Sequence, residues 1–118
     1  MINEDLKVRT KNFAVRIIKL FAALPKTTEA QVIGKQFLRS GTSVGAQYRE
    51  SQHAKSEADF VSKIDGSLPE LEETTYWLEL LEKMNLFSSE KLKPIQQETK
   101  ELTAIFVTIS KKVKARRT

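Results

Sequence analysis

The sequence predicts an all-α protein that folds as one antiparallel up-down-up-down four-helix bundle spanning residues 1–118. Three observations lead to this prediction. Only 4 Gly and 3 Pro interrupt the 118 residues, which is too few for a protein of short strands and turns. Hydrophobic residues make up 40% of the chain, too many for a disordered one. They recur at intervals of three and four in four segments, none of which could bury its apolar face alone.

The first predicted helix covers about residues 3–24. Its apolar residues follow helical spacing: Leu6, Phe13, Ile17, Ile18, Leu20, Phe21 and Leu24. Pro25 ends this helix, because the residue before a proline is disfavoured from helical geometry.

The second predicted helix covers about residues 28–51, with Thr27 or Thr28 as its cap. Its apolar stripe contains Ile33, Phe37, Val44 and Tyr48, and three glycines lie near the same side: Gly34, Gly41 and Gly45. A glycine inside a helix costs about 1 kcal/mol relative to alanine, so close packing should compensate. Gly41 and Gly45 form a GxxxG pattern, which favours a close contact either within the chain or between subunits.

The third predicted helix covers about residues 56–84, and Ser56 with Asp59 resembles a capping box. Its stripe contains Phe60, Ile64, Leu68, Leu71, Leu78 and Leu81. Pro69 falls inside it and predicts one bent helix, with a kink between residues 65 and 69.

The fourth predicted helix covers about residues 89–114 and has the most regular stripe, namely Leu92, Ile95, Thr99, Leu102, Phe106, Ile109 and Val113. Pro94 offers an alternative start, with residues 89–93 as a lead-in. We expect the helix to fray in the basic tail after Val113.

The net charge of +5 is unevenly distributed. Residues 1–55 carry ten Lys or Arg against four Asp or Glu, whereas residues 56–118 carry ten against eleven. Within that second part, residues 57–83 hold eight acids and two lysines, and residues 111–118 hold five cations. This segregation favours an anionic partner or a contact between unlike faces of two subunits.

The chain contains no cysteine, which excludes disulfides, thiolate nucleophiles and thiolate metal ligands. Its N-terminus turns polar and acidic at once and lacks the apolar segment of a secretory signal. The apolar stretch at residues 17–24 is interrupted by Lys19 and is far shorter than the roughly 20 residues that cross a bilayer. We therefore expect a soluble cytoplasmic protein without membrane contact.

The patterns that could carry chemistry have simpler explanations. Glu50 and His53 have Glu-x-x-His spacing, but a di-iron bundle site needs a second such pair and His53 is the only histidine. We interpret His53 as a solvated connector residue. The hydroxyls of Ser40, Thr42 and Ser43 have no positioned base and are expected on the surface or in packing contacts.

An acidic run on the third predicted helix admits three interpretations. Its carboxylates could be paired for catalysis, could contact another subunit or could form a solvated helix face, which is the commonest role of such a run. The run consists of Glu70, Glu72, Glu73, Glu79 and Glu82. No phosphate-binding glycine loop or dinucleotide fingerprint is present. We expect no enzymatic activity, cofactor, metal or small-molecule substrate.

Tyr76 and Trp77 lie beside the stripe of the third predicted helix rather than on it. Aromatic residues at a bundle edge are either partly buried core or anchors of an interface. The candidate interface between subunits therefore consists of Gly41, Gly45, Tyr76 and Trp77.

The sequence resembles a bacterial family of four-helix bundles encoded by intervening sequences in 23S ribosomal RNA genes. The resemblance covers nearly the whole chain and is carried by FLRSGTSVGAQYRE at residues 37–50 and ETTYWLELL at residues 73–81. Asp59-Phe60, Gly66-Ser67-Leu68 and Glu70-Leu71 strengthen it. Gln47 and Pro69 depart from the family pattern, at positions that usually hold asparagine and a helix-favouring residue.

The resemblance implies a ring-like homopentamer and kinship to the accessory protein of diversity-generating retroelements, which binds nucleic acid through a basic surface. Five residues match the family motif and are expected to have a structural role, joining the second helix to its neighbours: Arg39, Ser40, Thr42, Ser43 and Glu50.

Charge and resemblance together predict a non-enzymatic homo-oligomer that binds structured RNA or DNA through backbone phosphates, without base readout. The candidate contacts are Lys7, Arg9, Lys11, Arg16, Lys19, Arg39, Arg49, Lys111, Lys112, Arg116 and Arg117. The alternative is a protein-interaction scaffold, in which the acidic third helix meets a basic face of the next subunit and no nucleic acid is bound.

Overall fold

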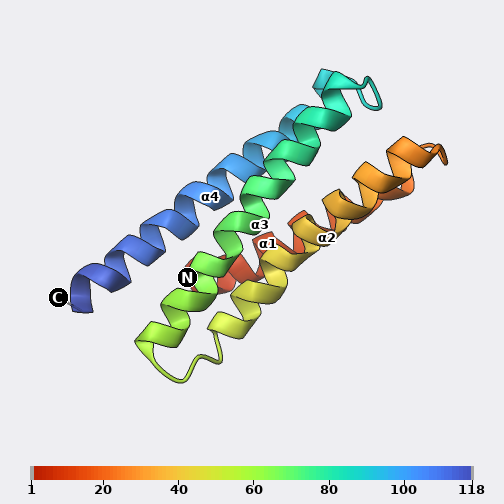
Figure 1. The fold of residues 1–118 in the computed structure, drawn as a ribbon. Coiled ribbons are helices and arrows are strands. Elements are labelled where there is room, and N and C mark those ends of the chain that lie inside the picture. The colour runs from red at the N-terminus through yellow and green to blue at the C-terminus, as the bar shows by residue number, and fades with distance from the viewer. Residues whose placement is uncertain (1, 118) are drawn as a thin grey trace.

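The computed structural model describes the backbone of residues 2–117 and the side chains of residues 5–116. It contains four helices in antiparallel order: α1 (Ile2–Ala22), α2 (Thr28–Ser51), α3 (Glu57–Lys83) and α4 (Ser89–Arg117). The start of α1 and the end of α4 lie at the same end of the molecule, as an up-down-up-down order requires (Figure 1). The predicted all-α four-helix fold is confirmed, and the predicted helix bounds agree with the observed ones to within three residues.

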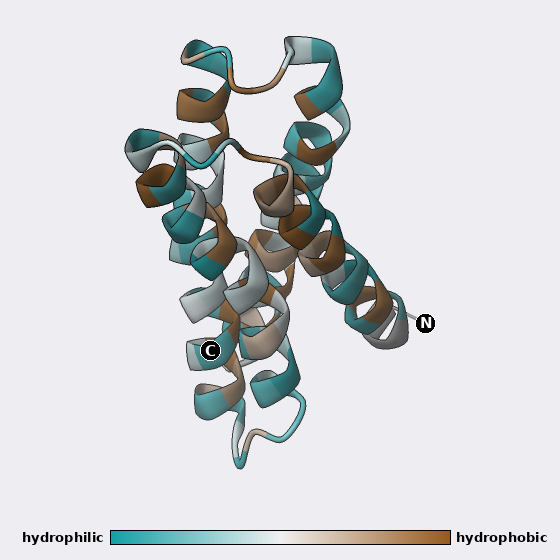
Figure 2. Cartoon of the chain, turned by 90° about the vertical axis from the view of Figure 1, so that its right-hand side faces the viewer, coloured by the Kyte–Doolittle hydropathy of each residue, from teal (hydrophilic) through white to brown (hydrophobic). Residues whose placement is uncertain are grey.

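The apolar stripes of the four helices meet in one core. Its fully buried large side chains include at least one aromatic or branched residue from every helix, among them Phe13, Phe37, Leu71 and Phe106. The rings of Tyr48 and Phe106 stack across the core with their centroids 6.0 Å apart. Hydrophobic residues follow the inner sides of the helices in Figure 2.

The helices do not contact each other equally. α2 packs along both α1 and α3, and α3 packs along α4, whereas the backbones of α1 and α4 come close at few positions. The N-terminal end of α1 diverges from the other helices (Figure 2). The bundle is therefore more open between α1 and α4 than elsewhere.

Side-chain caps fix where three of the helices begin. The Thr27 hydroxyl accepts a hydrogen bond from the Ala30 amide at the start of α2, and Ser56 accepts one from the Asp59 amide at the start of α3. Ser88 accepts a hydrogen bond from the Lys91 amide, so α4 begins before Pro94 and residues 89–93 are already helical. The alternative start at Pro94 is wrong.

Two other expectations need correction. The fourth helix does not fray after Val113 but continues to Arg117, because Lys114 pairs with Asp65 and Arg116 with Glu57 on α3. Ile18 is 47% exposed, because only one flank of α1 faces the core and Ile18 lies beyond that flank.

α3 continues through Pro69 as a single helix, as predicted. Within residues 2–117 no helix is apolar over enough of its length to cross a membrane.

Candidate functional site

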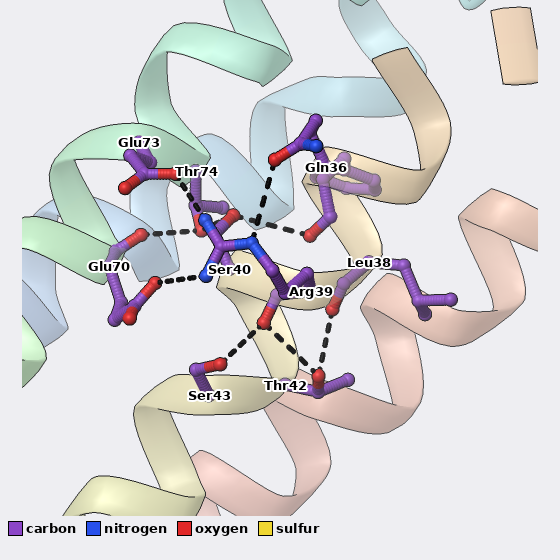
Figure 3. A network of polar contacts seen from close by, with 10 residues as sticks. Gln36, Leu38, Arg39, Ser40, Thr42, Ser43, Glu70, Glu73 and Thr74 are labelled. Carbon is purple, nitrogen blue, oxygen red and sulfur yellow. Dashed lines mark hydrogen bonds and ion pairs between the residues drawn. The ribbon is translucent and has the colours of Figure 1, made fainter. Parts of the chain in front are cut away.

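Arg39 and Ser40, two of the residues that match the family motif, form a polar network with residues of α3 (Figure 3). The Arg39 guanidinium donates to Glu70, with Nη1 3.2 Å from Oε1, and to the Glu73 carboxylate. At the next residue of α2, the Ser40 hydroxyl lies 2.8 Å from that of Thr74, and both side chains are buried. These contacts fix the register of the two helices at the middle of the bundle.

Glu50 adds a third contact between α2 and α3 near the C-terminal end of α2, where its carboxylate lies 3.0 Å from Lys63 Nζ. Thr42 and Ser43 instead donate to carbonyl oxygens of their own helix, at Leu38 and Arg39. The predicted joining role is therefore confirmed for Arg39, Ser40 and Glu50 and is wrong for Thr42 and Ser43, whose hydroxyls remain within α2.

The acidic run on α3 is only partly a solvated face. Glu70 and Glu73 bind Arg39, and Glu82 accepts hydrogen bonds from Ser89 and Gln96 of α4, which lower the pKa of its carboxyl. Glu72 and Glu79 are exposed, and no partner is found for them within the described side chains. Three carboxylates of the run thus bind residues of α2 or α4, and the other two are exposed and unpaired.

The close packing predicted for the glycines occurs between α1 and α2. A Cβ atom at Gly41 would come within 2.7–2.9 Å of three side-chain atoms of Ile17. At Gly45 it would lie 3.3 Å from the Thr10 side chain. Both glycines therefore lie in a close contact within the chain. This is the first of the two predicted alternatives, the second being a contact between subunits.

The basic surface is centred on α1. The sequence from residue 6 to residue 28 contains six Lys or Arg and no Asp or Glu. Lys7, Lys11 and Lys19 are exposed on α1, and Arg16 is partly exposed. A helix with cations of this density and no acid between them has a strongly positive potential.

Arg9 differs from the other cations of α1 because it is bound to α4. Its guanidinium donates two hydrogen bonds to Glu98, at 3.0 and 2.6 Å, and one of 3.0 Å to Glu101. The hydrogen bond with Glu98 is the largest contribution that raises the pKa of Arg9. Arg9 therefore bridges α1 and α4 where few other contacts join them and is not a free cation.

Three cations converge at the opposite end of the same seam. Arg16 and Lys19 of α1 and Lys91 of α4 line a surface hollow of about 200 Å³, whose remaining lining residues are Leu20, Pro94 and Ile95. Lys91 was missed in the sequence analysis. It directly precedes Leu92, the first core residue of α4, and the antiparallel order places the start of α4 beside the end of α1.

The remaining candidate contacts are dispersed. Arg49 lies near the end of α2, and Lys111 and Lys112 lie on the last turns of α4; all three are exposed. Arg116 is paired with Glu57 at 3.4 Å. The side chain of Arg117 lies outside the described residues. These cations lie on other helices than the α1 cluster.

The two candidate interface aromatics lie side by side on α3, and only Tyr76 is largely exposed. Tyr76 is 53% exposed, and its ring meets that of Trp77 edge to face with a centroid distance of 5.1 Å. Trp77 packs partly against the core, and its indole nitrogen is buried without a hydrogen-bond partner among the described atoms.

The residues considered for metal binding have other surroundings. His53 is exposed in the turn after α2, and Glu50 is engaged by Lys63. Among the described side chains no group of three or more His, Asp or Glu could hold a metal ion. Ser40, the most buried of the motif hydroxyls, contacts Thr74 and the Phe37 carbonyl rather than a base.

The fold and the charge distribution define a class: a small four-helix bundle with one basic helix and a polar network that joins α2 to α3. The chain belongs to the family of 23S rRNA-intervening sequence proteins, whose family model it matches over residues 4–108.

A solved structure supports this assignment. It is that of a protein of unknown function from the S23 ribosomal protein family of Bacteroides thetaiotaomicron, 39% identical in sequence. The similarity covers 94% of this chain and 99% of that one, with a TM-score of 0.88. The sequence matches no curated protein.

Proposed function

We propose that this protein is a non-enzymatic, homo-oligomeric bundle that binds structured nucleic acid through backbone phosphates. One observation carries the nucleic-acid part of the proposal: Arg16, Lys19 and Lys91 line one hollow at the end of α1, which has no acidic residue after Asp5. Phosphate oxygens are the ligands that such a cluster neutralises best, and each neutralised phosphate releases counterions. The homo-oligomeric part rests on the family resemblance.

The ion pairs narrow the surface that we propose to contact phosphates. Arg9 and Arg39 are held by carboxylates of α4 and α3, so their charges already have partners. The proposed contacts are Lys7, Lys11, Arg16, Lys19 and Lys91, which leaves Arg49, Lys111 and Lys112 outside the main surface. Phosphate contacts carry no sequence information, so the binding should follow the shape of the nucleic acid.

A mobility-shift titration with a structured fragment of 23S ribosomal RNA tests this proposal. The test variant carries Arg16→Glu, Lys19→Glu and Lys91→Glu. A control variant carries Lys35→Glu, Lys55→Glu and Lys83→Glu, which makes the same change in net charge at three exposed residues elsewhere. For the native chain, the logarithm of the association constant should fall with that of the salt concentration by about 0.9 per neutralised phosphate.

The test variant should bind at least ten-fold more weakly than the control, and its salt slope should be smaller by about two to three. Equal losses in the two variants would show that only net charge matters. Binding by the native chain that does not respond to salt, or no binding at low salt, would also contradict the proposal.

The alternative, a scaffold without nucleic acid, is favoured by a different observation. Exposed Tyr76 lies between the unpaired acids Glu72 and Glu79. This part of the surface is acidic, whereas the α1 surface is basic. If the native chain forms oligomers but binds no RNA at low salt, this alternative replaces the first proposal.

A further inference from the structure

Two surfaces of the molecule lie outside the proposed phosphate-binding surface: an acidic face of α3 with an exposed aromatic ring, and an apolar groove with a cationic rim. The two are complementary in charge and in apolar character. We propose that the outer face of α3 in one copy, formed by Glu72, Tyr76 and Glu79, docks into a groove on α4 of a second copy, to whose lining Phe60 of α3 contributes. This inference rests on the homo-oligomeric part of the proposed function and assigns the two surfaces that would form the contact.

The α3 face combines an exposed aromatic ring with uncompensated charge. The other acids of the described α3 bind partners within the chain: Glu57, Asp59, Asp65, Glu70, Glu73 and Glu82. Glu72 and Glu79 do not, and they lie one turn before and one turn after Tyr76. The edge-to-face contact with Trp77 limits the motion of the Tyr76 ring, which lowers the entropy lost when it is buried.

The groove offers an apolar floor and a cationic rim. It has a volume of about 530 Å³, and Phe60 of α3 with Ile105 and Ile109 of α4 supply much of its apolar lining. Lys112 and Arg116 line it toward the end of α4. A second hollow of about 300 Å³ shares Phe60, Val113 and Arg116 and continues it toward the turn after α2.

Small residues in the middle of the groove leave room for a helix to approach. Ala104 and Thr108 are exposed and lie one turn apart on α4, so their row presents little bulk. If Tyr76 of one copy lies over this row, an acid one turn away lies opposite Lys112, because one turn advances about 5.4 Å along either helix. A charged pair beside a buried aromatic ring matches the usual anatomy of an interface, with an apolar centre and a polar rim.

A second copy fits the groove better than a nucleic acid does. The floor of the groove is apolar, whereas phosphates need cations and hydrogen-bond donors. The acidic α3 face would repel a polyanion but attracts Lys112, the cation of the rim that has no partner among the described side chains. Because the two surfaces differ, the contact is head-to-tail, and repeated contacts of this kind close into a ring or continue as a filament.

Measurement of molecular mass in solution by light scattering tests the contact with two single variants. Tyr76→Ala removes the anchor from one surface, and Ala104→Arg fills the groove at an exposed helical position. Each should shift the native oligomer toward monomer, with at least a ten-fold rise in the apparent dissociation constant. Val32→Ala and Ala46→Arg, at exposed residues of α2, are the matched controls and should keep the native mass.

Mixing the two test variants gives a sharper result. The Tyr76→Ala chain keeps an intact groove and the Ala104→Arg chain keeps an intact α3 face, so the mixture should form a heterodimer and nothing larger. A circular dichroism spectrum and an unfolding midpoint close to those of the native chain establish that each variant is folded.

The outcomes separate this inference from the proposed function. If the native chain is a monomer at all concentrations, both the homo-oligomeric proposal and this contact are wrong. If the native chain is an oligomer and both test variants keep its mass, only the assigned contact is wrong. If the mixture forms oligomers as large as the native one, the contact is not head-to-tail between these two surfaces.

Discussion

At Gly41 the backbone of α2 lies directly against a side chain of α1. The Cβ atom of any other residue would come within 3.0 Å of Cγ1, Cγ2 and Cδ1 of Ile17, and the first two are held close to the α1 backbone. Ile17 is itself fully buried, so it has little room to move. Gly45, one turn further on, faces the smaller Thr10 and has more space.

These contacts predict opposite effects for two similar substitutions. Gly41→Ala should lower the free energy of unfolding by about 1–3 kcal/mol, because overpacking outweighs the helical preference of alanine. Gly45→Ala should change it by less than about 1 kcal/mol in either direction, because the contact is tight but adjustable. Urea unfolding followed by circular dichroism compares the two. A Gly41→Ala chain as stable as the Gly45→Ala chain would contradict the packing described here.

The Ser40–Thr74 pair has a similar role at the contact of α2 with α3. Each of the two buried hydroxyls also bonds to a carbonyl of its own helix, and they contact each other only in one register of the helices, because a shift by a turn would remove this contact. The exposed ion pairs of Arg39 lie over this contact. The family motif at residues 37–50 is therefore accounted for largely by packing and register rather than by chemistry.

At the scale of the helices, the last turns of α4 depend on α3. Ser110 donates a hydrogen bond of 2.6 Å to Asp65, and Lys114 lies 3.0 Å from the other oxygen of the same carboxylate. Partial burial raises the pKa of Asp65, but the bonds from Ser110 and Lys114 outweigh it, so the pKa lies below its ordinary value.

This arrangement predicts a pH dependence of stability. Because the pKa of Asp65 is lower in the folded chain, its stabilising contribution is present above the ordinary value of 3.8 and is lost as the pH falls through the folded value. The contribution is at most about 1 kcal/mol, since the carboxylate is more than a third exposed. Asp65→Asn should reduce the loss of stability between about pH 5 and pH 2.5.

Two lysine variants provide the comparison for this prediction, measured by urea unfolding at each pH. Lys114→Ala should weaken the same acid dependence, whereas Lys111→Ala, which removes an equal charge at an exposed residue without contact to Asp65, should not. An identical acid dependence in the native and Asp65→Asn chains would show that this carboxylate does not stabilise the folded state.

The helices could be predicted from the sequence because their signals are local. Apolar spacing, Thr27 and Ser56 as caps, and Pro25 as a break each act within a few residues of one helix. The prediction placed Ile18 in the core because its spacing fits a wide stripe, but the position of the neighbouring helices decides which flank of α1 is covered. The end of α4 was misjudged for a related reason, since its last turns are held by residues of α3.

The candidate surface could be predicted only in part. The run of cations on α1 without an acid is visible in the sequence, and so is the acidity of α3. The pairing of Arg9 with Glu98, 89 residues away, is not, because it depends on the relative register of α1 and α4. The same dependence concealed the approach of Lys91 to Arg16 and Lys19.

At the scale of the whole molecule, opposite charges lie on different helices. The α1 surface is basic, and the outer face of α3 has two unpaired acids around Tyr76. Use of the α3 face and the α4 groove for assembly would leave the α1 surface of every subunit free. An oligomer would then present several phosphate-binding surfaces at once, and linked sites of this kind raise the apparent affinity by factors of about 10²–10⁴ without any new contact.

The two proposals together therefore predict that assembly raises the affinity for nucleic acid, and that the effect depends on the length of the RNA. Tyr76→Ala leaves every cation of α1 in place, so its affinity for a duplex short enough to contact one subunit should stay within about two-fold of the native value. Its affinity for a long structured RNA should fall at least ten-fold, because only an oligomer binds such an RNA at several sites. Fluorescence anisotropy with the two RNAs, at one salt concentration, measures both values. Equal losses on the short and the long RNA would place Tyr76 in the binding surface itself, and no loss on either would show that assembly does not contribute to binding.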